Sequence, residues 1–223
     1  MNTRKEIQFQ AAEGSTKVSA ILNFNLESKA VLVLAHGAGA GMQHSFMEDI
    51  SKMLVHYSVA VFRFNFPYME GTRGRPDPPN RAMKTIESAF GEVKKHLGLP
   101  IFIGGKSFGG RMASHLAAVN KMPELKGIVF FGFPLHAPGK PGIERARHLS
   151  EIKEPMLFLQ GTRDALARID LIDEVTNPIA NAEVYFYEGA DHSFKVLKKM
   201  GIDYDQMMDR LAKDTADWIT ELI

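Results

Sequence analysis

The chain begins with two short segments in which every second residue is apolar. These are positions 7 and 9, and then positions 18, 20, 22 and 24. A period of two is typical of a strand with one buried face, so the segments predict an antiparallel hairpin at the edge of a sheet. Glu13, Gly14 and Ser15 supply the residues for a turn between them.

From residue 30 onward, short continuous apolar runs alternate with segments of helical periodicity. The apolar runs cover residues 30–35, 59–64, 101–103, 127–133, 155–160 and 184–187. Helices are expected after Ser45, with Glu48 as its capping-box partner, after an Asn80 cap, from near Ser107, over 169–176 and over 205–222. This order predicts an α/β fold with a mostly parallel sheet and helices on both of its faces. In such sheets, ligand sites form beyond the carboxyl ends of the strands.

Composition narrows the class of protein. The 223 residues suit a single domain, 1–223, and the 45% hydrophobic and 24% charged content is that of an ordinary globular protein. A net charge of +1 favours neither nucleic acid nor a membrane as partner. The absence of cysteine excludes disulfides, thiolate metal sites and a cysteine nucleophile. No signal-peptide core or spanning apolar run is seen, so a cytoplasmic location is expected.

The run 101–103 is followed by Gly105-Lys106-Ser107-Phe108-Gly109, a G-x-S-x-G pattern. A serine on a very tight strand-to-helix turn leaves no room for side chains two residues away, which explains both glycines. The same letters fit an ordinary glycine turn. They fit a phosphate-binding loop poorly, because the glycine that this motif requires is replaced by Pro100, so nucleotide binding is the weakest of the alternatives. Ser107 is therefore the candidate nucleophile.

A serine hydroxyl needs a base and an orienting acid to attack a carbonyl at neutral pH. His192 follows the last predicted strand. Taken alone, it fits a surface histidine in a turn better than a base, but its place after a late strand, downstream of the serine and the acid, makes it the candidate base. Asp164 follows the run 155–160 and is the candidate acid, and it can also form an Asx turn. Asp170 and Asp173 are weaker alternatives because both fall on the following helix. Asp191 is expected to fix the loop beside the histidine.

The developing oxyanion also needs backbone N–H donors. We expect them from Phe108, directly after the nucleophile, and from the turn His36-Gly37-Ala38-Gly39 after the first parallel strand. Ala38 is the first choice there and Gly39 the second. His36 is expected to brace this turn rather than to act on substrate. His44 and His136 have no partner that the sequence identifies.

These motifs, in the chain order Ser107, Asp164, His192, resemble the α/β-hydrolase superfamily. Within it, the runs Ala35–Gly39, Arg75–Pro79, Gly105–Arg111 and Asp191–Phe194 are most similar to a small, lid-less, dienelactone-hydrolase-like branch of predicted serine hydrolases. The resemblance spans nearly the whole chain. It implies the α/β-hydrolase fold with about 7–8 strands, no cofactor, no metal and hydrolysis through an acyl-enzyme. Dienelactone hydrolases use a cysteine nucleophile, so the serine here argues against dienelactone as substrate.

The segment between the runs 127–133 and 155–160 is too short for a helical cap domain, so an open site is expected. Basic residues that border it are either solvated surface charges or contacts for an anionic substrate; they are Arg73, Arg75, Arg81, Lys106 and Arg111. The sequence thus favours a serine hydrolase of small carboxylic esters or thioesters, whose partner is the ester itself. The alternative is a non-catalytic binding or scaffold protein that retains the fold.

Overall fold

The computed structural model describes residues 2–12, 16–71, 74–120 and 122–223. The predicted turn at 13–15 and the basic residue Arg73 lie outside these ranges. The strands are β1 (Thr3–Gln10), β2 (Lys17–Phe24), β3 (Ala30–Ala35), β4 (Val59–Phe64), β5 (Ile101–Lys106), β6 (Leu125–Phe131), β7 (Met156–Gly161) and β8 (Ala182–Tyr187). The helices are α1 (Ser45–His56), α2 (Pro79–Val93), α3 (Phe108–Val119), α4 (Ile169–Thr176) and α5 (Tyr204–Glu221). Short 3-10 helices are η1 (Pro67–Met69), η2 (Glu144–Glu151) and η3 (Lys198–Met200).

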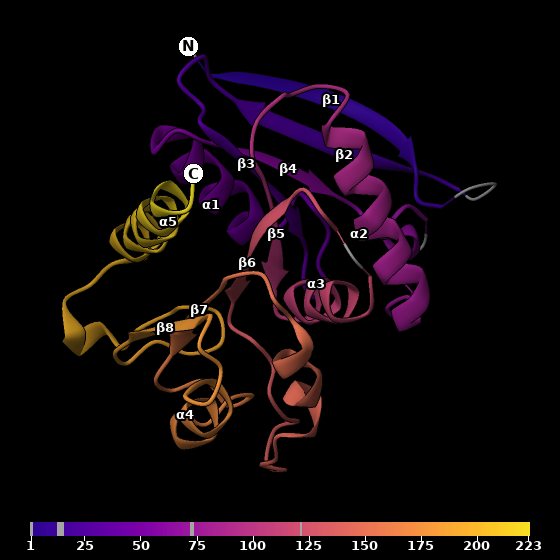
Figure 1. The fold of residues 1–223 in the computed structure, drawn as a ribbon. Coiled ribbons are helices and arrows are strands. Elements are labelled where there is room, and N and C mark those ends of the chain that lie inside the picture. The colour runs from indigo at the N-terminus through magenta and orange to yellow at the C-terminus, as the bar shows by residue number, and fades with distance from the viewer. Residues whose placement is uncertain (1, 13–15, 72–73, 121) are drawn as a thin grey trace.

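All eight strands of the described ranges form one twisted sheet in the order β1-β2-β4-β3-β5-β6-β7-β8 (Figure 1). β1 pairs with β2, and β2 with β4, in antiparallel fashion, so the predicted hairpin forms one edge. All other pairings are parallel. This is the α/β-hydrolase fold that the sequence predicted, without a separate cap domain. Because the central strands end in register, as with Ala35 opposite Gly105, the loops that follow them converge on one edge of the sheet.

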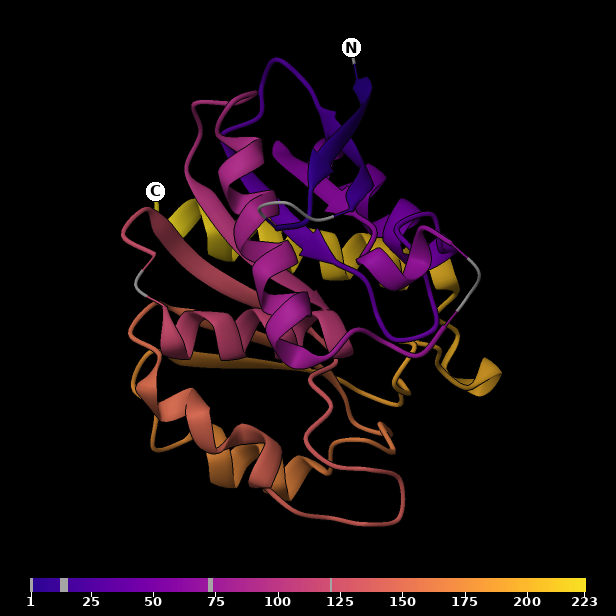
Figure 2. The same cartoon turned by 90° about the vertical axis from the view of Figure 1, so that its right-hand side faces the viewer.

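Helices cover both faces of the sheet, and each face has its own core. Consecutive residues of β3 point in opposite directions: Val31 and Val33 pack toward α2 and α3, whereas Leu32 and Leu34 pack toward α1 and α5. Figure 2 shows α5 on the far side of the sheet from α2 and α3. Burial on both faces explains why this strand is apolar throughout.

Two predicted helix starts are wrong. α1 begins at Ser45, but its cap is His44, whose Nδ1 accepts a hydrogen bond from the Phe46 N–H at 3.3 Å. Glu48 instead pairs with the buried Arg63. α2 begins at Pro79 rather than after an Asn80 cap, because the fixed φ of proline suits the first position of a helix and the missing N–H costs nothing there.

The turn between β5 and α3 holds Ser107 in a backbone conformation that L-residues rarely adopt, with φ of 50° and ψ of −112°. The flanking glycines make this possible. A Cβ added to Gly105 would lie 2.5 Å from the carbonyl oxygen of Ala35, and one added to Gly109 would overlap the same oxygen. The turn is therefore packed directly against the end of β3.

We expect Gly109→Ala to lower the free energy of unfolding by about 2–3 kcal/mol, the upper part of the range for overpacked cores. The matched control is Gly91→Ala in the last turn of α2, where an added Cβ meets no atom within 4 Å outside the backbone of its own helix. That change should leave stability unchanged or raise it by up to about 0.5–1 kcal/mol, because alanine favours helix. Urea unfolding of both variants is the measurement. Equal stability of Gly109→Ala and the wild type would contradict the close approach to Ala35.

Candidate active site

Side chains from three loops at the carboxyl edge of the sheet form one hydrogen-bonded chain. His192 Nε2 lies 2.9 Å from Ser107 Oγ, and His192 Nδ1 lies 2.7 Å from Asp164 Oδ2. An ionised carboxylate only accepts hydrogen bonds, so Nδ1–H donates to Asp164 and the neutral Nε2 accepts from the Ser107 hydroxyl. The structure thus brings together the serine, histidine and aspartate that the sequence singled out.

Asp164 is nearly buried, with 5% of its surface exposed, and three donors fix its carboxylate. Besides His192, Gln160 Nε2 donates to Oδ2 at 2.7 Å, and the Leu166 N–H donates to Oδ1 at 2.8 Å. The last contact is the Asx-type turn expected at this position. Gln160 Oε1 in turn accepts from the Phe133 N–H at 3.0 Å. Sequence reasoning missed Gln160; its only signal was a polar residue at the end of an otherwise apolar run.

The alternative acids are placed elsewhere. Asp170 and Asp173 both lie on α4. Asp170 is exposed and pairs with Arg168 at 2.6 Å. Asp191 uses its carboxylate to accept from the N–H groups of Ser193 and Lys195, at 2.8 and 3.0 Å, which fixes the loop that carries His192.

The turn after β3 lies beside the serine. A Cβ added to Gly37 would lie 3.9 Å from Ser107 Cβ. The Gly39 N–H is engaged with the Tyr68 hydroxyl at 3.3 Å. Within the described ranges, neither the Ala38 N–H nor the Phe108 N–H donates to a protein acceptor. Two free donors are therefore available near Ser107, and Ala38 is better placed to serve than Gly39.

His36 has a structural role. It is fully buried, its Nδ1 donates to the Gly37 carbonyl at 2.8 Å, and its Nε2 accepts from the Phe66 N–H at 3.0 Å. Burial lowers the pKa of His36 to about 4, so the ring stays neutral and keeps its acceptor. The structure therefore agrees with the prediction that His36 stabilises this turn by hydrogen bonding.

His44 and His136, for which the sequence identified no partner, each form hydrogen bonds in the structure. His44 is the cap of α1 described above. His136 donates through Nδ1 to the Ala137 carbonyl at 2.9 Å and accepts through Nε2 from the Arg168 N–H at 3.2 Å. Both contacts are to backbone groups, which no sequence motif encodes.

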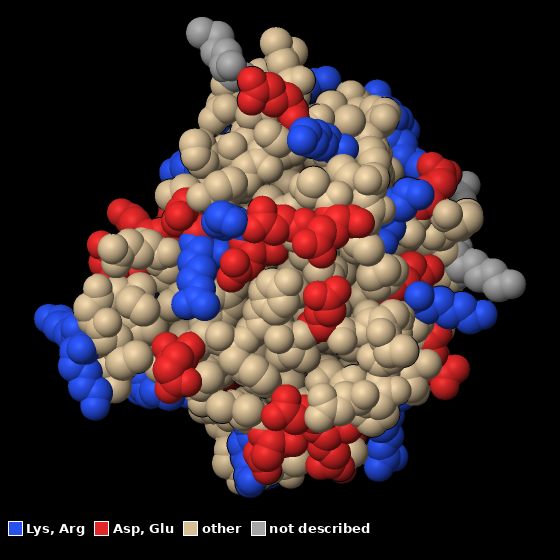
Figure 3. Space-filling view, turned by 60° about the vertical axis from the view of Figure 1, so that its left-hand side comes forward, with Lys and Arg blue, Asp and Glu red and all other residues tan. Residues whose placement is uncertain are grey.

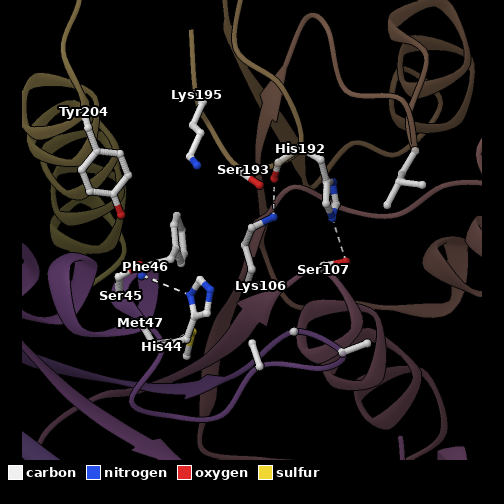
Figure 4. A pocket seen from close by; sticks show the side chains of 14 residues that line it. His44, Ser45, Phe46, Met47, Lys106, Ser107, His192, Ser193, Lys195 and Tyr204 are labelled. Carbon is white, nitrogen blue, oxygen red and sulfur yellow. Dashed lines mark hydrogen bonds between the residues drawn. The ribbon is translucent and has the colours of Figure 1, made fainter. Parts of the chain in front are cut away.

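A pocket of about 500 Å³ opens beside Ser107 and His192 (Figure 4). The first turn of α1 forms one wall and the segment after His192 forms another. Its lining residues are Gly37, Ala38, Ala40, His44, Ser45, Phe46, Met47, Lys106, Ser107, Leu166, His192, Ser193, Lys195 and Tyr204. Sequence reasoning did not identify Lys195 or Tyr204 as part of a site.

Most of the basic residues expected near the site do not line this pocket. Arg81 pairs with Asp77 at 3.3 Å. Of these basic residues, Arg75, Arg81 and Arg111 do not line the pocket, whereas Lys106 does. Lys106 is therefore the one that remains a candidate contact for an anionic substrate in the described ranges.

The described residues contain no cluster of three or more His, Asp or Glu side chains arranged to hold a metal ion. None of their helices combines the length and the apolar character needed to cross a bilayer.

Residues 28–220 match the family described as "Alpha/beta hydrolase domain", and the chain belongs to this family.

Similar solved structures cover almost the whole chain. A dienelactone hydrolase from Anabaena variabilis has a TM-score of 0.76 at 17% identity, covering 99% of both chains. An alpha-beta serine hydrolase homologue from Coxiella burnetii has a TM-score of 0.73 at 18% identity, covering 93% of this chain and 96% of the other. Est1E from Butyrivibrio proteoclasticus has a TM-score of 0.70 at 16% identity, covering 97% and 98%. At these identities the likeness is one of fold.

Proposed function

We propose that this chain is a serine hydrolase that cleaves small carboxylic esters, with thioesters as a second substrate class. The observation that carries the proposal is the continuous hydrogen-bonded chain from Asp164 through His192 to Ser107, which ends on the strained turn. The similar structures include proteins named as esterases from Rhodothermus marinus and Pyrococcus furiosus, which supports ester hydrolysis as the reaction class.

In the proposed mechanism, Ser107 Oγ attacks the ester carbonyl while His192 Nε2 takes its proton. Asp164 holds the imidazole in the required tautomer and stabilises the imidazolium. The N–H groups of Ala38 and Phe108 bind the oxyanion. His192 then returns the proton to the leaving alcohol, which leaves an acyl-enzyme on Ser107.

Deacylation repeats these steps with water. His192 removes a proton from a water molecule, which attacks the acyl carbonyl, and the tetrahedral intermediate again places its oxyanion against Ala38 and Phe108. Collapse releases the acid and restores the Ser107 hydroxyl. Each step uses this chain's own groups, and the proposal includes no cofactor and no metal.

Covalent labelling tests the proposal. A fluorophosphonate probe should label the wild type, and Ser107→Ala should abolish the labelling while the variant stays folded by circular dichroism. Ser150→Ala is the matched control, because Ser150 is exposed and its hydroxyl donates a hydrogen bond to the Arg147 carbonyl, away from the pocket lining. An unlabelled, folded wild type that hydrolyses no p-nitrophenyl ester of any chain length would favour the non-catalytic scaffold instead.

A further inference from the structure

The charged side chains that line the candidate pocket are all basic. Among the described residues that line it, two are lysines, Lys106 and Lys195, and none is Asp or Glu. The outer surface differs. On the face that includes α5, basic and acidic side chains lie side by side (Figure 3). The α5 pairs Arg210–Asp214 and Lys213–Asp217 belong to this balanced surface.

Lys106 directly precedes the candidate nucleophile, and its ammonium group lies beside the catalytic chain. Nζ donates to the His192 carbonyl and lies 5.7 Å and 5.4 Å from the ring centres of Phe46 and Phe194. An ammonium has three donors. In the described part of the chain, the other two have no acceptor, although aromatic faces help to stabilise the charge.

Gly132 creates the space for this arrangement. A Cβ added there would lie 3.1 Å from Lys106 Nζ and 3.4 Å from His192 Nδ1. The same missing side chain thus admits both the ammonium and the imidazole. The two carboxylates whose charge acts on Lys106 are Asp164 and Asp191. Both accept the hydrogen bonds described above, and neither forms an ion pair with Lys106 in the part of the chain that the structure describes.

Lys195 reaches the pocket from the side opposite to Lys106 (Figure 4). Its backbone N–H is fixed by Asp191, and its side chain extends toward the space between Tyr204 and Lys106 (Figure 4). Its Nζ forms no ion pair or hydrogen bond with any residue that the structure describes. Tyr204, in contrast, is engaged with Asp49. The pocket therefore holds two ammonium groups with unused donors.

We propose that Lys106 and Lys195 form an anion-binding subsite, so that the preferred ester carries a carboxylate or phosphate group near the carbonyl that Ser107 attacks. This inference rests on the proposed function, since it names the substrate class of the same site. A bound anionic oxygen would accept hydrogen bonds from the unused N–H groups of both ammonium groups. It would also compensate the charge of the partly buried Lys106.

Matched esters test the subsite. On the acyl side, methyl hydrogen glutarate is compared with the neutral methyl valerate. On the alcohol side, 4-acetoxybutanoate and 3-acetoxypropyl phosphate are compared with butyl acetate, which separates carboxylate from phosphate. Acid release gives kcat/KM for each. We expect at least one anionic ester to exceed its neutral partner by about tenfold or more, as hydrogen bonds to charged groups allow.

Variants of Lys195 give the sharper result, because Lys106 also holds the His192 loop. Lys195→Glu should lower the anionic-to-neutral ratio of kcat/KM by about tenfold or more, since it replaces attraction by repulsion. Lys198→Glu is the matched control: it lies on the same segment, is exposed and does not line the pocket. It should leave the ratio unchanged. A ratio near one in the wild type, or a ratio retained in Lys195→Glu, would overturn the subsite.

The pH dependence of the same ratio reports on Lys106. Burial lowers the pKa of Lys106 to about 8, although Asp164 and Asp191 act in the opposite direction. Its charge is present below this pH and is lost above it, so the ratio should fall as pH rises through 8. Of the other titratable groups that line the pocket, His44, His192 and Tyr204 act on the neutral ester too wherever they affect catalysis. The charge of Lys195 acts on the anionic ester alone, so a variant of Lys106 is needed to assign the inflection. Lys106→Met should remove the inflection; an unaltered inflection would contradict the assignment.

Product binding separates this inference from the proposed function. Calorimetry with Ser107→Ala compares glutarate with valerate, and no turnover is involved. If no ester is hydrolysed but glutarate binds and Lys195→Glu abolishes the binding, the subsite stands and the esterase proposal fails. If esters are hydrolysed without preference and glutarate does not bind, the esterase proposal stands and the subsite fails.

Discussion

If the proposed mechanism holds, replacing His192 by alanine should lower kcat for p-nitrophenyl esters by about 10⁶-fold, as loss of the base does in a known Ser-His-Asp hydrolase. His192 Nε2 is the one side-chain group hydrogen-bonded to Ser107 Oγ among the described residues, so removing the imidazole removes the base that takes the proton. The residual activity of the variant should come from the backbone N–H donors and from substrate binding alone. Initial-rate kinetics with the purified variant are the measurement.

The double variant makes this test specific. Ser107→Ala combined with His192→Ala should be no slower than either single variant by more than about a few-fold, because residues that act as one unit are not additive. His56→Ala is the control, since this histidine is exposed on α1 and remote from the pocket. Losses that multiply in the double variant would show that His192 does not act through Ser107.

Asp164→Asn should reduce kcat by about 10⁴-fold while the fold persists, following the precedent for this position in such triads. The carboxylate accepts from both His192 Nδ1 and Gln160 Nε2. An amide offers an acceptor and a donor, and a donor toward His192 would favour the wrong tautomer. Kinetics and a thermal melt of the same preparation separate lost catalysis from lost stability.

The control for this change also decides between the candidate acids. Asp170→Asn removes an exposed carboxylate that pairs with Arg168, and we expect no measurable change in kcat. If Asp170→Asn is impaired and Asp164→Asn is active, the assignment of the orienting acid is wrong.

The sequence predicted much of the architecture because periodicity reports local burial. The all-apolar run at Ala30–Ala35 marked a strand covered on both faces, and the alternation before it marked an edge hairpin. Helix starts were less predictable. A cap depends on which side chain reaches the free N–H groups, and at α1 this is the His44 ring rather than the Ser45 hydroxyl.

The partners of the site residues were less predictable than the residues themselves. Gln160, which orients Asp164, carries no motif, and its role depends on how β7 lies beside the loop after β6. Lys195 lies at the pocket because Asp191 stabilises the turn that carries it, through a hydrogen bond to the Lys195 N–H. Neither contact follows from spacing along the chain.

By itself, the sequence determined the order of strands and helices, the strained serine turn with its two glycines, and the identity of the polar groups that end the strands. These follow from local sterics and from the burial of neighbouring residues. Only the tertiary structure decided which of these groups meet. The register of the parallel strands sets the loops side by side, and loop hydrogen bonds then aim His192 at Ser107 and two lysines at one pocket. Such contacts join residues far apart in the chain, so their geometry exists only once the sheet is assembled.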